Sequence, residues 1–474
     1  MPQLHTPDVY IEEIPTFPPS VAEVATAIPA FVGYTEKAAG SDGKSLTNRP
    51  WKVRSLKDYE AIFGLPHADT ISVTVAGDVK SGFRVSVADL DPKYTLYHAV
   101  RMFFDNGGGQ CYVVSVGDYG TDPLTATALT TGLKALEAES EPTLLVVPEA
   151  VKLSVADYQT VVQAMIKQCG ELGDRFAIID VWHGTVGMDA DVEQTDPDDS
   201  NKKVSKKLAE WNRSAWTGEL RYGAAYYPFL RTTLAYYVPE GDKNVTVGPA
   251  PSNGTPPTLD TIKTMDTARY NAIKAELRNH YYVLPPSGAI AGIYAGTDAT
   301  RGVWKAPANV ALADVIEPLV KITSAEQDPM NVDPTTGKSI NAIRSFAGRG
   351  TLVWGARTLD GNSNEWRYVS VRRFFNMVEE SVKLSTHWAV FEPNDANTWV
   401  KVRGMIENYL TDKWRDGALA GATPREAFYV RCGLGATMSA QDILQGVMNV
   451  EIGMAVVRPA EFIVLKFSHK LQTS

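Results

Sequence analysis

Two tripeptides are the parts of this sequence closest to a phosphate-binding loop. Gly43-Lys44-Ser45 and Gly337-Lys338-Ser339 both have its Gly-Lys-Ser ending. A complete loop has another glycine five residues before that last glycine, because the backbone N–H groups must wrap closely around the phosphates. Ala38 and Val332 occupy those two positions. The sequence therefore predicts that neither tripeptide binds a nucleotide.

An acidic run is the second feature that could do chemistry. An EF-hand calcium loop requires glycine at its sixth position, where this run has Gln194. We interpret the run as a solvated acidic loop, and we expect no metal site. Its members are Asp189, Asp191, Glu193, Asp196, Asp198 and Asp199.

The remaining chemistry-bearing residues are scattered. The seven histidines form neither an HExxH motif nor a close pair, and His387 beside Trp388 is typical of a packed or capping residue. No GxSxG nucleophile motif is present. We expect no catalytic residue and no cofactor; since a catalytic triad need not be local in sequence, an enzyme, such as an NTPase that powers assembly, stays open as an alternative.

The bulk properties exclude several classes of protein. The net charge is −9 without a Lys/Arg block, which disfavours a nucleic-acid surface. Cys111, Cys169 and Cys432 lie far apart, so we expect buried thiols and folding in a reducing compartment. The first residues lack the basic and apolar runs of a secretory signal, and no run of about 18 apolar residues predicts a membrane span.

The patterning predicts several domains, as a length of 474 residues also suggests. Residues 1–20 are rich in proline and read as an extended arm. An alternating stretch at 66–90 predicts a hairpin. Apolar strands and amphipathic helices then alternate between 120 and 235, which favours an α/β layer. Polar stretches at 187–203, 239–258 and 326–341 read as loops, the last also as a domain boundary.

A second α/β region is predicted for the last 130 residues. Amphipathic helices are expected at 367–385 and 396–416, followed by a strand at 427–432. A final pair of strands is expected at 448–456 and 461–469, joined by a turn at 455–459.

Six stretches of the chain resemble the contractile tail sheath family, which includes phage, pyocin and extracellular injection-system sheaths. The start of the chain looks closest to the extracellular injection systems, and residues 41–280 match loosely. The stretches are TPDVYIEEIPTFPPSVAEVATAIPAFVGYTEKA, PPSGAIAGIYAGTDATRGVWKAPAN, RSFAGRGTLVWGARTL, WRYVSVRRFFNMVEES, HWAVFEPND and VEIGMAVVRPAEFIVLKF.

The resemblance implies a mixed α/β (α+β) sheath-type fold with a discontinuous inner domain and an inserted outer domain that carries a small β-subdomain. The expected parts are an arm at 1–20, an inner core at 21–35 with 340–460, a β-rich outer subdomain at 36–118, an outer α/β domain at 119–339 and a C-terminal arm strand at 461–474.

The resemblance also implies a structural subunit that polymerises around an inner tube and contracts. The expected partners are further copies in stacked, hexameric rings, the tube protein, baseplate and cap proteins and sheath paralogues, with no nucleic acid and no membrane insertion. Synthesis in the bacterial cytoplasm without a signal peptide and release within an extracellular particle are implied. A non-contracting baseplate or tail-terminator protein of the same fold and a secreted adhesin are the alternatives.

Both chain ends are candidates for strands lent to neighbouring subunits. A short arm without a hairpin partner must satisfy its backbone groups at some sheet edge, on its own domain or on another subunit, and the resemblance favours the latter. The candidate contacts are Val9, Tyr10, Ile11, Phe462, Ile463, Val464, Leu465 and Phe467. The candidate tube contacts, Lys401, Arg403, Lys413 and Arg415, lie on the helix expected at 396–416, where an ordinary solvated face is the other interpretation.

Overall fold

The computed structural model describes residues 20–40, 43–80, 82–120, 122–196, 199–239, 241–248 and 256–464. The chain divides into two compact units. Unit 1 comprises 1–24 and 377–457, and unit 2 comprises 25–376 and 458–474. Each unit is described separately below.

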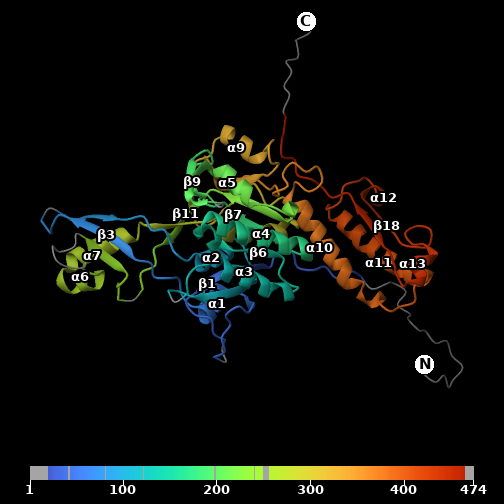
Figure 1. The fold of residues 1–474 in the computed structure, drawn as a ribbon, viewed down its shortest axis with the longest axis horizontal. Coiled ribbons are helices and arrows are strands. Elements are labelled where there is room, and N and C mark those ends of the chain that lie inside the picture. The colour runs from blue at the N-terminus through green and yellow to red at the C-terminus, as the bar shows by residue number, and fades with distance from the viewer. Residues whose placement is uncertain are drawn as a thin grey trace, which may run out of the picture. The chain divides into compact units, whose positions relative to one another are not determined.

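A mainly parallel, nine-stranded sheet forms the centre of unit 2 (Figure 1). Its order is β14-β17-β16-β10-β7-β6-β1-β5-β2, and the six strands from β16 to β5 run parallel. The nine strands are β14 (Val310–Ala311), β17 (Gly350–Val353), β16 (Ile340–Phe346), β10 (Gly223–Tyr227), β7 (Phe176–Asp180), β6 (Leu144–Val146), β1 (Pro29–Thr35), β5 (Cys111–Asp118) and β2 (Trp51–Val53).

Helices cover both faces of this sheet, and each strand therefore has apolar residues on both sides. Phe31 of β1 packs into the core that contains α2 (Leu96–Asp105) and α8 (Ser287–Arg301). Its neighbour Val32 packs into the opposite core. That second core contains α3 (Ala126–Ala135), α4 (Val155–Leu172) and α5 (Leu208–Ala215). The predicted α/β layer at 120–235 is part of this sheet.

Helices α2 and α8 pack unusually closely because α8 presents glycine every fourth residue. Gly288, Gly292 and Gly296 all face α2 or the turn that follows it. A Cβ atom at Gly292 would lie 2.6 Å from the carbonyl oxygen of Phe103 in α2. The family-like stretch that includes α8 thus has a structural role, since the backbone of α2 occupies the space that side chains would need.

Smaller elements complete unit 2, and all three stretches that were predicted as loops contain helices or strands. The stretch at 187–203 contains β8 (Asp191–Asp196) and the start of β9 (Asp199–Lys207), which form a hairpin, and the stretch at 239–258 contains β12. β12 (Val245–Gly248), β3 (Ile71–Ala76) and β4 (Arg84–Val87) form the sheet of a small subdomain with α6 (Leu259–Met265) and α7 (Thr267–Leu277) (Figure 1). The predicted hairpin at 66–90 is β3–β4. The other elements are α1 (Leu56–Phe63), β13 (Tyr281–Leu284), β11 (Leu230–Ala235), β15 (Val315–Pro318) and α9 (Ser324–Asn331). Most of helix α9 and the start of β16 lie in the stretch at 326–341.

Unit 1 consists mainly of helices. α10 (Val369–Ser385) begins in unit 2, and its second half, from Met377, belongs to unit 1. The other elements are α11 (Ala396–Arg415), α12 (Pro424–Ala427), β18 (Phe428–Arg431), α13 (Ala440–Leu444) and β19 (Glu451–Met454). β19 pairs with β18, so the predicted pairing of 448–456 with 461–469 is wrong for the described residues: 461–464 form no strand, and 465–469 lie outside that part.

The bounds of the compact units differ from the predicted domain bounds. Strands β1 and β16 hydrogen-bond within the nine-stranded sheet, which places 25–35 and 340–376 with the middle of the chain. A sequence pattern shows strands but not their order, and the order decides this division. The mixed α/β class is as predicted, whereas the terms inner and outer refer to an assembly and stay predictions.

Candidate functional site

The parallel sheet has a position where many α/β proteins bind phosphate. Strands β5, β1, β6, β7 and β10 follow the doubly wound order 2-1-3-4-5, whose ligand crevice lies at the carboxyl ends of the first and third strands. Glu149, which follows β6, occupies this place. Its carboxylate accepts hydrogen bonds from the N–H groups of Tyr34, Thr95 and Leu96, at 2.9, 3.1 and 3.2 Å.

Glu149 therefore caps helix α2 where a bound phosphate would do so in a nucleotide-binding protein. The side chain is completely buried. Burial raises the pKa of Glu149 to about 7, against the lowering effect of the three N–H groups. The crevice at this end of the sheet is filled by the protein itself.

The two Gly-Lys-Ser tripeptides do not form phosphate loops either. The Lys338 ammonium donates to the carbonyl oxygens of Arg213 and Trp216, at 2.6 Å each, and Ser339 leads into strand β16. Ser45 pairs with Ala39 in an isolated bridge. Neither tripeptide lies at the start of a helix, which is where a phosphate loop must end.

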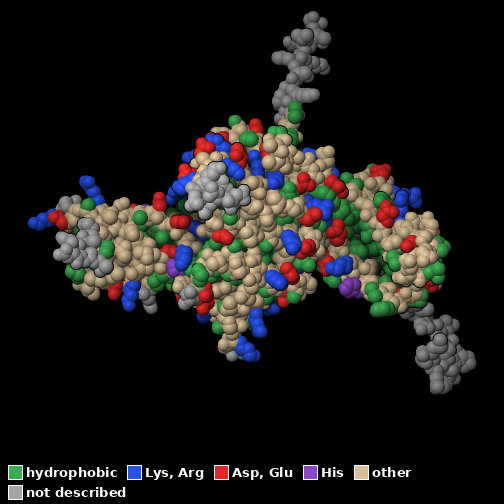
Figure 2. All heavy atoms as spheres, viewed as in Figure 1, with side chains coloured by type: hydrophobic (Ala, Val, Ile, Leu, Met, Phe, Trp, Pro, Cys, Tyr) green, Lys and Arg blue, Asp and Glu red, His purple; other side chains and the backbone are tan. Residues whose placement is uncertain are grey.

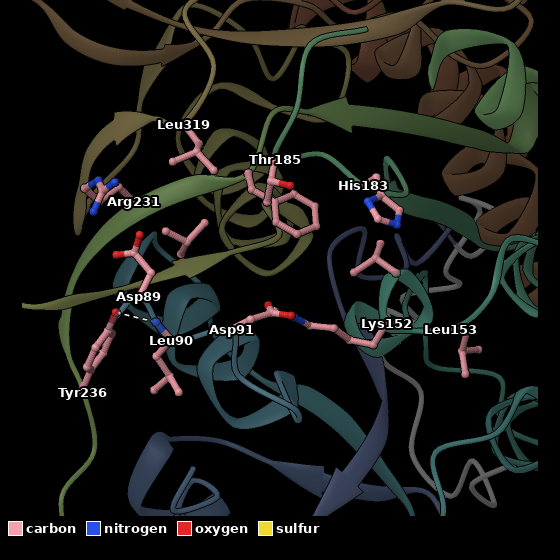
Figure 3. A pocket seen from close by; sticks show the side chains of 13 residues that line it. Asp89, Leu90, Asp91, Lys152, Leu153, His183, Thr185, Arg231, Tyr236 and Leu319 are labelled. Carbon is pink, nitrogen blue, oxygen red and sulfur yellow. Dashed lines mark hydrogen bonds and ion pairs between the residues drawn. The ribbon is translucent and has the colours of Figure 1, made fainter. Parts of the chain in front are cut away.

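A cavity of about 450 Å³ in unit 2 is lined by both polar and apolar residues (Figure 3). Lys152 forms an ion pair with Asp91, and the Leu90 N–H donates to the Tyr236 hydroxyl at 3.0 Å. Burial lowers the pKa of His183 on the cavity wall. Because polar groups here bind one another, this cavity gives no separate indication of a ligand.

Part of the acidic run lies in the β8–β9 hairpin, and Asp198 lies outside the described residues. Two of its carboxylates face lysines of β9: Asp191 pairs with Lys207 at 2.8 Å, and Glu193 pairs with Lys203 at 2.7 Å. Within the described residues, no group of three or more His, Cys, Asp and Glu side chains could hold a metal ion. On the face shown in Figure 2, basic and acidic side chains are interspersed rather than gathered into a basic patch.

The C-terminal segment leaves unit 2 at an ion pair whose arginine is buried. Glu461 accepts from the Arg357 guanidinium in a two-pronged arrangement, with Nη2 at 2.6 Å and Nε at 2.9 Å. Burial raises the pKa of Glu461, but hydrogen bonds from Arg357 and Asn331 outweigh it and hold that pKa below its ordinary value. The next three residues, Phe462, Ile463 and Val464, are 72–78% exposed. The predicted contacts Leu465 and Phe467 lie outside the described residues.

The N-terminal contacts Val9, Tyr10 and Ile11 also lie outside the described residues. The segment that follows them is held along the helices of unit 1. The N–H groups of Ala22 and Val24 donate to the hydroxyls of Ser385 and Ser381 of α10, at 3.0 and 3.1 Å. The Glu23 carboxylate lies 2.6 Å from the Lys413 ammonium of α11.

The four predicted tube contacts on α11 differ in their surroundings. Lys413 is largely buried by its pairing with Glu23 and Asp416, so it holds the N-terminal segment. Arg403 and Arg415 are more exposed and pair within the helix, whereas Lys401 is exposed. Contact of these four residues with a tube stays a prediction. Lys413 is the least accessible of them, because it pairs with Glu23 and Asp416.

A small sheet in unit 1 has little cover. β18 and β19 form a two-stranded antiparallel ladder from Phe428–Met454 to Arg431–Glu451. Only Val430 among its eight residues is buried. Two strands alone are marginally stable, and their outer edges offer unpaired backbone groups to a further strand.

Comparisons with known proteins give the family of this chain. The family profile of the phage tail sheath protein central domain matches residues 245–359, and that of the phage tail sheath C-terminal domain matches 362–470. A chain in the cryo-EM structure of the anti-feeding prophage (AFP) baseplate is 31% identical, with a TM-score of 0.65, over 99% of this chain and 100% of that chain. This chain belongs to the phage tail sheath family.

Two further matches come from an injection system and from a phage. A chain in the cryo-EM structure of the PVC sheath complex, an extracellular contractile injection system in the contracted state, is 31% identical over 98% of both chains, with a TM-score of 0.63. The tail sheath protein of Vibrio phage KVP40 is 28% identical over 147 residues, which are 30% of this chain and 21% of that protein. The chain thus matches about a fifth of the length of that curated relative.

Membership of the sheath family confirms the family predicted from the sequence, its likeness to the extracellular injection systems, and a structural rather than enzymatic class. No helix in the described part of the chain is long and apolar enough to cross a membrane.

Sequence analysis missed an exposed apolar surface on this sheath chain. Phe391 is fully exposed and has a φ of 70°, a strained conformation for phenylalanine. Asn394 binds the carbonyl oxygen of Val447 at 3.0 Å, which brings the Phe391 loop beside the segment after α13. Figure 2 shows hydrophobic side chains over this part of unit 1. Its exposed apolar residues include Leu384, Val390, Phe391, Val400, Leu434, Leu444 and Val447. The family-like stretch HWAVFEPND contained Phe391 and was the available clue.

Proposed function

We propose that this chain is the repeating subunit of a contractile sheath that surrounds an inner tube and shortens to drive that tube through a target envelope. The proposal rests on the family and on one structural observation. The segment after Glu461 presents Phe462, Ile463 and Val464 to solvent without a partner strand among the described residues. Consecutive apolar residues that are 72–78% exposed indicate a segment that is completed by another chain.

The sheet of β18 and β19 is the acceptor that we propose for lent strands. An added strand would pair its backbone groups with an open edge, while its apolar side chains set the register. The alternation after Glu461 suits this role, because Ile463 and Leu465 share one face of an extended strand and Phe462 and Val464 share the other. The N-terminal residues Val9, Tyr10 and Ile11 are proposed to act in the same way on a second neighbour.

Contraction in this account needs no bound fuel molecule. The extended sheath is a trapped state, and the shortened sheath has more or better contacts between subunits. Each compact unit moves as a rigid body, and the lent strands keep neighbours connected during the movement. A gain of a few kcal/mol per subunit, about the effect of one good contact set, adds up over many subunits.

The proposed partners follow from the same reasoning. Copies of the chain stack in hexameric rings around a tube protein, with a baseplate at one end and a cap at the other, and sheath paralogues join them. The likeness to an AFP baseplate chain supports contact with a baseplate, and the likeness to PVC supports a released extracellular particle. The exposed apolar residues around Phe391 and the exposed cation Lys401 are candidates for contacts with the tube or with neighbours.

Truncation of the arms tests this function. Deletion of residues 1–13, or of 462–474 with Glu461 retained, should leave a folded monomer with nearly unchanged thermal unfolding. Electron microscopy and sedimentation should find no tubes. Deletion of 471–474 serves as the matched control and should assemble. Normal contractile tubes from either long truncation would contradict the proposal, as would unfolding of the monomer.

A non-contracting baseplate or terminator role is the alternative that the AFP baseplate likeness favours. It predicts that the purified full chain stops at single rings or short stacks whatever its concentration. Long tubes that convert to a wider, shorter form would exclude it.

A further inference from the structure

Two guanidinium–carboxylate sites with buried arginines bind the segments through which the two ends of the chain leave unit 2. At the C-terminal one, Glu461 accepts from Arg357, from the Asn331 amide at 3.0 Å and from the Tyr368 hydroxyl at 3.3 Å. Arg357 is 3% exposed, and its remaining N–H groups donate to the carbonyl oxygens of Asn331 and Gly361. We call Glu461, Arg357, Asn331 and Tyr368 the C-terminal mooring.

The N-terminal site has the same chemistry. Arg373 of α10 holds both carboxylate oxygens of Asp298 in α8, at 2.5 and 3.0 Å, and donates to the Thr26 carbonyl oxygen at 2.8 Å. The Thr26 hydroxyl donates to Asp298 at 2.6 Å. The side chains of Arg373 and Asp298 are 3% and 7% exposed. We call Arg373, Asp298 and Thr26 the N-terminal mooring.

Both moorings connect parts of the sequence that are far apart. Glu461 is 104 residues from Arg357, and Thr26 is 347 residues from Arg373. Each mooring joins a segment near one end of the chain to an element that continues or packs on the main sheet: Arg357 follows β17, and Asp298 lies in α8. A two-pronged guanidinium–carboxylate pair restricts the relative orientation of its two side chains, whereas packing of apolar residues tolerates small shifts.

We propose that the two moorings are positioning elements that fix where each end of the chain leaves unit 2, so that the lent C-terminal strand starts from a defined point and tension on it passes into the nine-stranded sheet. This inference rests on the proposed function. The 13 residues after Glu461 extend at most about 45 Å. A shift in the position of Glu461 therefore changes which sheet edge of a neighbouring subunit they reach. A loosely held Glu461 would also let the strand slip in register, which exchanges its two faces.

The mobility of the arm just beyond Glu461 tests the C-terminal mooring directly. The three native cysteines are buried, so a nitroxide label can be placed at Ile463→Cys. Electron spin resonance then compares the labelled parent chain with the same chain carrying Glu461→Ala. Glu365→Ala, which removes an exposed glutamate of unit 2, is the matched control. Assembly is measured on unlabelled chains without the cysteine, by sedimentation and electron microscopy.

We expect slow rotation of the nitroxide in the parent and control chains. In Glu461→Ala we expect its rotation to be several-fold faster, with an unchanged circular dichroism spectrum. Tube yield should fall, because a strand whose starting point is no longer fixed can pair in the wrong register. If Glu461→Ala does not fold, Glu461→Gln keeps the shape without the charge and should give a smaller change of the same sign.

Two outcomes would overturn the inference: equal label mobility in Glu461→Ala and the control, or a freed label with tubes formed at the parent yield. Failure of the proposed function looks different, because the parent chain itself would then form no tubes. The mobility comparison in the monomer would still decide whether Glu461 clamps the arm.

Discussion

In unit 2, helices α2 and α8 approach so closely that a Cβ at Gly292 would meet the backbone of Phe103. In unit 1, Phe391 stands fully in solvent, and the β18–β19 sheet has one buried residue. In unit 2 the protein's own side chains fill the close contacts. Even the crevice where a ligand could bind holds the Glu149 carboxylate, bonded to three backbone N–H groups. Unit 1 leaves apolar side chains in solvent, as expected of a region that other chains cover in an assembly.

The largest expected effect on stability is at the α2–α8 contact of unit 2. Gly292→Leu should destabilise the chain by about 3 kcal/mol or more, because the backbone of α2 cannot move away without loss of the core. Thermal or denaturant unfolding measures this. Gly109→Leu is the matched control, since its Cβ would meet nothing within 4 Å and its backbone is not left-handed. Equal stability of both variants would contradict the tight α2–α8 contact.

A second effect concerns the pH dependence of unit 2. Burial raises the pKa of Glu149 to about 7 in the folded chain, so the unfolded chain releases this proton at lower pH. The folded chain thus binds more protons between the ordinary glutamate range and about 7, and this group's contribution to stability falls by about 3 kcal/mol as pH rises through that window. Glu149→Gln should flatten the fall in a denaturant series at several pH values, whereas Glu137→Gln, at an exposed site, should leave it unchanged. An unchanged slope in Glu149→Gln would refute the assignment.

The smallest effect on stability is expected at the exposed apolar residues of unit 1. Phe391→Ser removes an exposed ring in a strained backbone position, so unfolding of the monomer should change by less than about 0.5 kcal/mol. Assembly with the tube, or between copies, should weaken nonetheless. Ile406→Ser, at a buried position of the same unit, is the opposite control and should destabilise the monomer. If Phe391→Ser assembles like the parent chain, this surface is not an interface.

Sequence analysis predicted the elements of unit 2 well because their pattern is local. Apolar runs such as Phe176–Asp180 and the helix at Val155–Leu172 have a clear period and few competing interpretations. It failed where polar residues form strands: the hairpin of β8 and β9 is stabilised by cross-strand ion pairs such as Asp191–Lys207. It could not give the bounds of the compact units, since the place of β16 beside β10 depends on contacts more than 100 residues apart; the predicted domains stay a prediction.

The candidate site shows the same limit. The stretches that resemble the family contain Thr26, Asp298, Arg357, Arg373 and Glu461, but nothing in the sequence pairs these residues with one another. The cations predicted on α11 were chosen as a charged face, and Lys413 proves to be occupied by Glu23, which is 390 residues away. Electrostatic partners of this kind become visible only when the fold brings distant segments together.

The central claim is that the segment after Glu461 completes the sheet of β18 and β19 in another copy of the chain. A cryo-EM reconstruction of tubes assembled from the full chain tests it most directly. The account predicts residues 462–467 as a strand on an edge of that sheet in a neighbouring subunit, with Glu461 still bound to Arg357 of its own chain. Tubes in which these residues lie on their own subunit, or contact no sheet edge, would contradict it.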